Sequence, residues 1–170
     1  SIPQHSYIIM SWGIYCNELN ASEARRLYHG QKTRIEKYPF MASIHIDVDF
    51  MCAGSIISMY FVLTAASCLK MYAFLSVRIG SSFYESGGEE IAVMEVYFHP
   101  SYNPKNLHNN LAVMRLIRSI KFRKKQRTVK KISLDTVDSS LPTNTPGIVI
   151  VEISTTISNL IGPFKSRRRY

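Results

Sequence analysis

Short apolar runs separated by turn residues recur through this chain, and they constrain its fold more than any other feature. The run at 41–48 is rich in Ile and Val and partly alternates with polar residues. Gly, Ser and Pro clusters, such as those at 80–82 and 86–88, lie between the runs. Short strands with turns between them predict an all-β domain, either a barrel or a sandwich. The predicted strands are 41–48, 53–57, 61–65, 75–79, 91–98, 111–116 and 148–153, with one short helical turn at 65–69.

Length and composition bound the organisation of the chain. Its 170 residues are 46% hydrophobic, which is enough for a sizeable core in one domain or one and a half. No apolar stretch approaches the roughly 18 residues that a transmembrane helix needs, so no membrane span is expected. The apolar run at 7–15 has about the length of a signal-peptide core. We therefore interpret 1–26 as a degenerate signal or pro-segment.

A series of linked motifs resembles the trypsin/chymotrypsin-like serine proteases (peptidase S1). Thr-Ala-Ala-Ser-Cys at 64–68 is similar to the family's Thr-Ala-Ala-His-Cys. Upstream, 38–44 and 52–57 resemble Tyr-Pro-Phe-x-Val-Ser-Ile and Cys-Gly-Gly-Ser-Leu-Ile. Downstream, 98–103 resembles the His-Pro-x-Tyr-Asn loop, and 109–116 resembles Asn-Asp-Ile-Ala-Leu-Leu-Lys-Leu. Several motifs in the right order are far more specific than one.

The resemblance covers 27–151 and implies a trypsin-like antiparallel β-barrel. That stretch corresponds to the first barrel of the two-barrel protease fold, so we expect the second barrel to be largely missing and 152–170 to be a C-terminal remnant with a basic tail. Arg26 and Leu27 lie where the family is cut on activation. An uncovered inter-barrel face would expose apolar surface, which predicts a protein partner or self-association.

The catalytic positions of the family are altered inside well-matched motifs. Ser67 stands at the position of the catalytic His, and a hydroxyl cannot accept a proton near pH 7 as imidazole does. Asn110 stands at the position of the orienting Asp and carries no charge. We interpret Asn110 as a polar residue at the start of a strand. His108 is the one His close enough in sequence to be considered as a replacement base, and a solvated loop His is the preferred interpretation.

The nucleophile motif Gly-Asp-Ser-Gly-Gly does not occur in the sequence. Ser154, Ser158 and Ser166 lack its flanking glycines. No catalytic residue is therefore predicted, and neither is a metal site or a cofactor.

The resemblance also implies a disulfide between Cys52 and Cys68, which would close the loop under the catalytic His position. Such a loop would contribute about 3 kcal/mol of stability on the chain-entropy model. Two buried free thiols are the alternative. A disulfide indicates an oxidising compartment, so we expect a secreted, extracellular protein. Cys16 is left without an assigned partner and is either free or paired with another chain.

The formal net charge is +9, and most of this surplus lies in one basic segment at 121–131. This pattern is typical of sites for sulfated glycans, nucleic acids or acidic membranes, or of a solvated loop. Phe122 is its one aromatic residue, which argues against a surface that stacks single-stranded bases. Secretion favours a glycan, so no nucleic-acid partner is expected. The basic residues are Lys121, Arg123, Lys124, Lys125, Arg127, Lys130 and Lys131.

The predicted function is that of a non-catalytic serine protease homologue that binds, as a decoy, cofactor or regulator of proteolysis. The alternatives are an active serine endopeptidase, a basic glycan-binding module, and the product of a decaying gene. The protein partner would be a protease, a component of a protease pathway, or a second copy of the chain.

Overall fold

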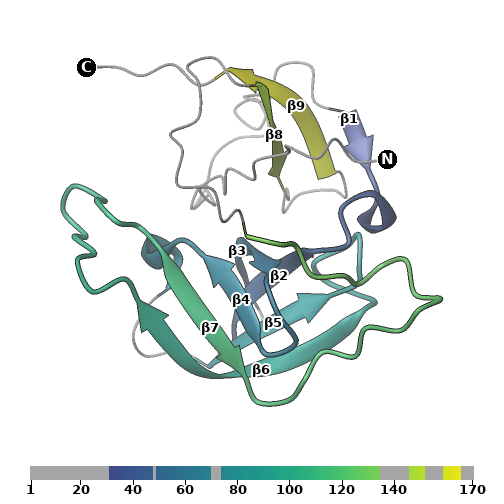
Figure 1. Ribbon diagram of the computed structural model, residues 1–170, viewed down its shortest axis with the longest axis horizontal. Coiled ribbons are helices and arrows are strands. Elements are labelled where there is room, and N and C mark those ends of the chain that lie inside the picture. The colour runs from purple at the N-terminus through teal and green to yellow at the C-terminus, as the bar shows by residue number, and fades with distance from the viewer. Residues whose placement is uncertain (1–30, 48, 70–73, 135–145, 152–158, 166–170) are drawn as a thin grey trace.

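The computed structural model describes residues 31–47, 49–69, 74–134, 146–151 and 159–165 (Figure 1). Its main body is a closed antiparallel barrel in the strand order β2-β3-β4-β7-β6-β5, with β2 pairing β5 to close the circle. This confirms the all-β prediction and the trypsin-like barrel. The barrel strands are β2 (Met41–Ile46), β3 (Asp49–Ile56), β4 (Phe61–Thr64), β5 (Leu75–Ile79), β6 (Glu89–Phe98) and β7 (Ala112–Leu116).

Alternation along the strands explains how the barrel fills its interior. In β7, Ala112, Met114 and Leu116 are buried, while Arg115 between them is exposed. In β5, Val77 and Ile79 are buried in the same way. Successive side chains of a strand point to opposite faces, so each barrel strand contributes every second residue to one core. That core also contains Ile44, Ile56 and Val62, which are fully buried.

A second, three-stranded sheet lies apart from the barrel, above it in Figure 1. Its order is β1-β9-β8, formed by Gln31–Thr33, Asn159–Lys165 and Pro146–Val151. A short 3-10 helix, η2 (Ile35–Lys37), follows β1. Tyr38, Phe40 and Ile150 form a small buried cluster of their own.

This sheet corrects the expected position of one strand. The run predicted at 148–153 does form a strand, β8, but β8 pairs with β9 and has no place in the closed barrel. The expected boundary at Val151 also falls between two strands that pair with each other, because Val151 lies opposite Leu160. Within the segment that we expect to be a C-terminal remnant, residues 159–165 form the paired strand β9. Hydrophobic periodicity predicts that a run is a strand, but it does not identify the partner strand.

Within the described ranges, no helix is long and apolar enough to cross a membrane.

Candidate functional site

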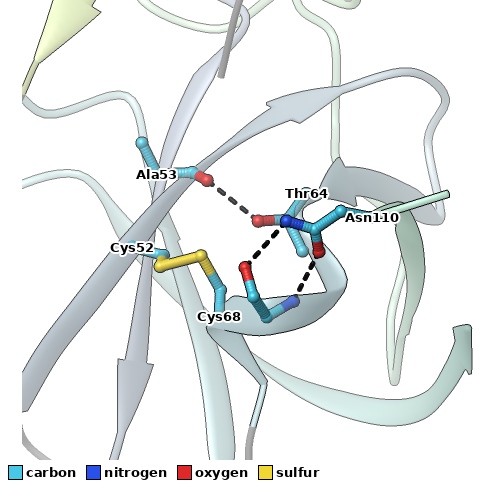
Figure 2. Close-up of a disulfide and its surroundings, with 6 residues drawn as sticks. Cys52, Ala53, Thr64, Cys68 and Asn110 are labelled. Atoms are coloured by element: carbon cyan, nitrogen blue, oxygen red, sulfur yellow. Dashed lines mark hydrogen bonds between the residues drawn. A yellow bond between two sulfur atoms is a disulfide. The ribbon is translucent and has the colours of Figure 1, made fainter. Parts of the chain in front are cut away.

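Two neighbouring barrel strands bring the altered base and acid positions together. β4 and β7 pair antiparallel, with Thr64 opposite Ala112. Ser67 follows β4 in the 3-10 helix η3 (Ala66–Cys68), and Asn110 lies two residues before β7. The end of β4 and the start of β7 therefore meet at one edge of the barrel, where Asn110 lies over η3 (Figure 2).

The Asn110 side chain makes two hydrogen bonds to Ser67. The backbone N–H of Ser67 donates to Asn110 Oδ1 at 2.7 Å. Asn110 Nδ2 in turn donates to Ser67 Oγ at 2.9 Å. Ser67 is exposed and Asn110 is half-buried. The interpretation of Asn110 as a polar residue at a strand start was therefore incomplete, because the side chain also bridges 43 residues of sequence.

These two bonds determine the chemistry that the pair can perform. A backbone N–H can only donate, so the amide oxygen must face it and the NH₂ group must face the hydroxyl. Ser67 Oγ therefore accepts a hydrogen bond from Asn110 Nδ2. The NH₂ group cannot accept the proton of the Ser67 hydroxyl in return. A serine becomes a nucleophile when an adjacent base accepts that proton. Asn110 turns its NH₂ group toward Ser67 Oγ, so Asn110 cannot act as that base.

The scaffold beneath the pair is covalent and buried. Cys52 on β3 and Cys68 at the end of η3 form a disulfide, with a Cα–Cα distance of 6.0 Å. This confirms the predicted disulfide. Thr64, which is fully buried, donates its hydroxyl to the carbonyl of Ala53 at 3.0 Å. Figure 2 shows the disulfide and this hydrogen bond close to η3. Together they hold the backbone that carries Ser67.

Comparison with known proteins identifies the family of the chain. The family model described as trypsin matches residues 27–155, which is more than half of the chain. The chain belongs to the trypsin family. Its curated relatives include trypsin of Sarcophaga bullata, 35% identical over 73% of this chain and 48% of that protein. Trypsin alpha-4 of Lucilia cuprina is 33% identical over 85% of this chain and 54% of that protein. This trypsin-family chain therefore spans about half the length of the curated relatives it matches.

Solved structures agree with this family fold. A scabies mite inactivated protease paralogue superposes with a TM-score of 0.71 at 27% identity, over 82% of this chain and 62% of that one. Human heparin binding protein superposes with a TM-score of 0.72 at 21% identity, over 81% of this chain and 64% of that one. At that lower identity the likeness shows the fold alone.

No histidine of the described part of this trypsin-family chain bonds to Ser67. His45 is buried in β2, with Nε2 3.0 Å from the hydroxyl of Ser43. His99 is exposed, and its Nδ1 accepts the N–H of Ser101. The position of His108 as an exposed loop residue matches the preferred interpretation. Its backbone bonds stay within the same loop, to Asn103 and to the side chain of Asn106.

The remaining predicted site residues lie elsewhere. The activation-like position at Arg26 and Leu27, Cys16 and the C-terminal serines lie outside the described residues. All seven cations of the basic segment are exposed on the connection that follows β7, which is separate from Ser67 and Asn110 in sequence. Within the part of the chain that the structure describes, no group of three or more His, Cys, Asp or Glu side chains could hold a metal ion.

Sequence reasoning missed the polar contacts that support the site. One is the hydrogen bond from Thr64 to the carbonyl of Ala53. The others are the two hydrogen bonds between Asn110 and Ser67, which join residues far apart in the chain. The one usable signal was their occurrence inside matched family motifs, since motifs that flank one site in a family are expected to meet in the fold.

Proposed function

We propose that this protein is a catalytically inactive member of the trypsin family that acts by binding, as a decoy, cofactor or regulator of proteolysis. The observation that carries the proposal is the closed hydrogen-bonded pair of Ser67 and Asn110. Acyl transfer in this family requires a base that accepts the proton of the nucleophile, and an acid that orients the base. A hydroxyl and an amide occupy the two positions.

The amide supports the proposal more strongly than the loss of a single catalytic group would. In the family's own archetype, an Asn in place of the orienting Asp costs about 10⁴ in kcat even with the base present. Here the base position is also changed, and Asn110 uses both ends of its amide on Ser67. Ser67 and Asn110 thus form a satisfied structural contact in place of a catalytic one. The scabies mite paralogue, whose printed description is an inactivated protease, is consistent with such a role.

A binding role requires a stable barrel that presents a surface, and the barrel retains its core and its disulfide. We propose a protein partner, which is a protease, another component of a protease pathway, or a second copy of this chain. The buried disulfide supports an extracellular location, since disulfides persist in oxidising compartments. The exposed basic segment adds a sulfated glycan as a second ligand class, on residues separate from Ser67.

Covalent labelling tests the absence of catalysis. The full chain is incubated with a fluorophosphonate probe, which reacts with activated serines, and its intact mass is then measured. An active trypsin serves as the positive control, and the Ser67→Ala variant serves as the matched negative control. We expect no added mass on the wild-type protein or on the variant. Stoichiometric labelling of the native wild-type protein at any serine would overturn the proposal.

Sedimentation velocity tests whether copies of the chain associate with one another. The full chain is sedimented over a range of micromolar concentrations. A sedimentation coefficient that rises with concentration would support association between copies. A single sharp monomer boundary at every concentration would exclude self-association in this range and leave a different protein as the proposed partner.

A further inference from the structure

The segment that follows β7 is a basic loop held firmly at both ends. We define the basic loop as residues 120–132; Figure 1 shows it as the green connection that runs out from the end of β7 to a tip and back. Ile120 is buried in the barrel core, and its N–H donates to the carbonyl of Met59 at 2.7 Å. At the other end, Val129 is also buried in that core and packs against Gly80, which has no Cβ to obstruct it.

Backbone bonds fix the returning arm of the basic loop. The N–H of Lys130 donates to Pro39 O, and the N–H of Ile132 donates to Ile56 O, both at 2.8 Å. At the tip, the N–H of Gln126 donates to Arg123 O at 3.0 Å and closes a turn. A loop held in this way loses little conformational freedom when it binds a ligand.

The cations of the basic loop are exposed to solvent. Among the described residues, none of the seven lies in an ion pair. The acids of β6 are paired elsewhere: Glu90 with Arg78 at 2.6 Å, Glu95 with Arg115 at 3.3 Å, and Glu89 with Arg118.

This contrast has an electrostatic consequence. Seven like charges in eleven residues repel one another and attract a dense polyanion, which gains entropy by releasing its condensed counterions. The three acids of β6 thus have cationic partners on the barrel, whereas the described residues supply no ion-pair partner to the cations of this loop.

We propose that the basic loop is a binding site for a sulfated glycosaminoglycan. Arg123 and Arg127 offer planar guanidinium groups that can bind sulfate oxygens in pairs, and the lysines add point charges along the same connection. A nucleic acid is disfavoured because Phe122 is the one aromatic side chain in 121–131, so single-stranded bases find no stacking platform. A membrane surface is disfavoured because the loop has no amphipathic helix to insert into the lipid headgroups. The site does not depend on catalytic inactivity, because it uses no residue of the Ser67 region.

Binding of the full chain to immobilised heparin, measured over a series of NaCl concentrations, tests the proposal. The test variant is Lys124→Gln/Lys125→Gln at the tip. The matched control is Lys37→Gln/Lys105→Gln, which removes two exposed lysines that lie outside the basic loop, in η2 and in the connection between β6 and β7. We expect the tip variant to lose about tenfold in affinity and to show a shallower salt dependence, by about one unit of slope per lysine. The control should stay within about twofold of the wild type, and unchanged melting temperatures would establish that all three proteins are folded.

The nature of the ligand is tested in parallel with desulfated heparin, single-stranded DNA and phosphatidylserine vesicles. Binding that requires sulfate and is lost with the tip lysines supports the proposal. Equal or tighter binding to DNA or to vesicles would overturn the choice of ligand. Equal losses in the tip variant and the control would overturn the choice of site, since non-specific attraction to a basic protein would then explain the retention. Each of these outcomes can occur whether or not the fluorophosphonate probe labels the protein.

Discussion

Asn110 Nδ2 donates to Ser67 Oγ at 2.9 Å, while Asn110 Oδ1 accepts the backbone N–H of the same Ser67 at 2.7 Å. The Asn110 side chain therefore links η3 to the segment just before β7. In an active trypsin-like enzyme this geometry would orient an imidazole. In this protein it joins two segments of the barrel, and its contribution to stability can be measured.

Removing the Asn110 amide should destabilise the barrel modestly. Asn110→Ala deletes both bonds to Ser67, each worth about 1 kcal/mol when shielded. Because Ser67 is exposed, water replaces part of the loss, and we expect about 1 kcal/mol in urea unfolding. Asn110→Asp keeps an acceptor for the backbone N–H and lets the Ser67 hydroxyl donate, so it should lie within about 0.5 kcal/mol of the wild type. Equal losses in both variants would contradict the assigned bonds.

The disulfide should contribute more than any polar contact of the site. Cys52 and Cys68 are 16 residues apart, and closing a loop of this length in the unfolded chain is worth about 3 kcal/mol. We expect the Cys52→Ala/Cys68→Ala variant to lose roughly that amount of unfolding free energy in urea. Reduction of the wild-type protein should lower its urea midpoint to about that of the double variant. Reduction of the double variant should leave its own midpoint unchanged. A double variant as stable as the oxidised wild type would contradict a stabilising disulfide.

Two adjacent glycines allow backbone strain and steric clash to be separated. Gly87 and Gly88 both have positive φ, +73° and +63°, so alanine at either position costs about 1–2 kcal/mol of strain. A Cβ at Gly88 would also lie 2.1 Å from the carbonyl oxygen of Ile79, whereas a Cβ at Gly87 would meet only Ser81, at 3.2 Å from its Oγ. Gly88→Ala should therefore cost about 3 kcal/mol or more in thermal or urea unfolding, clearly exceeding Gly87→Ala. Similar costs at the two positions would show that the strand end relaxes easily.

A polar cluster on the outer face of the barrel should respond to pH with a predictable sign. The Tyr97 hydroxyl donates to the Glu95 carboxylate, and this bond, with Arg115 next in size, holds the pKa of Glu95 below its ordinary value. The contribution of Glu95 to stability is therefore present above the ordinary pKa of a glutamate and is lost as pH falls through the lower folded value.

Carboxyl carbon NMR titration of Glu95 measures this shift directly. In Tyr97→Phe the largest cause is removed, so the pKa of Glu95 should rise toward its ordinary value while Arg115 keeps part of the depression. If the Glu95 titration is identical in the wild type and the variant, the bond to Tyr97 does not form in solution.

Much of the barrel could be predicted from local pattern. The strand β5 begins and ends where the apolar run does, and the predicted turn at 65–69 contains η3. Alternation in β7 separates Met114 in the core from the exposed Arg115, because the period of a strand is two. The substitutions at Ser67 and Asn110 are visible in the sequence once the flanking motifs are aligned with the family.

Local pattern contains no information on which strands pair or which loops meet. The closure of β2 on β5, the exclusion of β8 from the barrel, and its pairing with β9 are decided by register between distant segments. The contact of Asn110 with Ser67 likewise requires β4 and β7 to be neighbours first.

The sequence by itself thus determined the strands, the residue types at the altered catalytic positions and the charge of the basic loop. The tertiary structure alone decided that Ser67 is bound by an amide donor and that the basic loop is anchored at Ile120 and Val129. The physical reason is that propensity and alternation act within a few residues, whereas hydrogen bonds and packing across a barrel depend on the position of every strand between them.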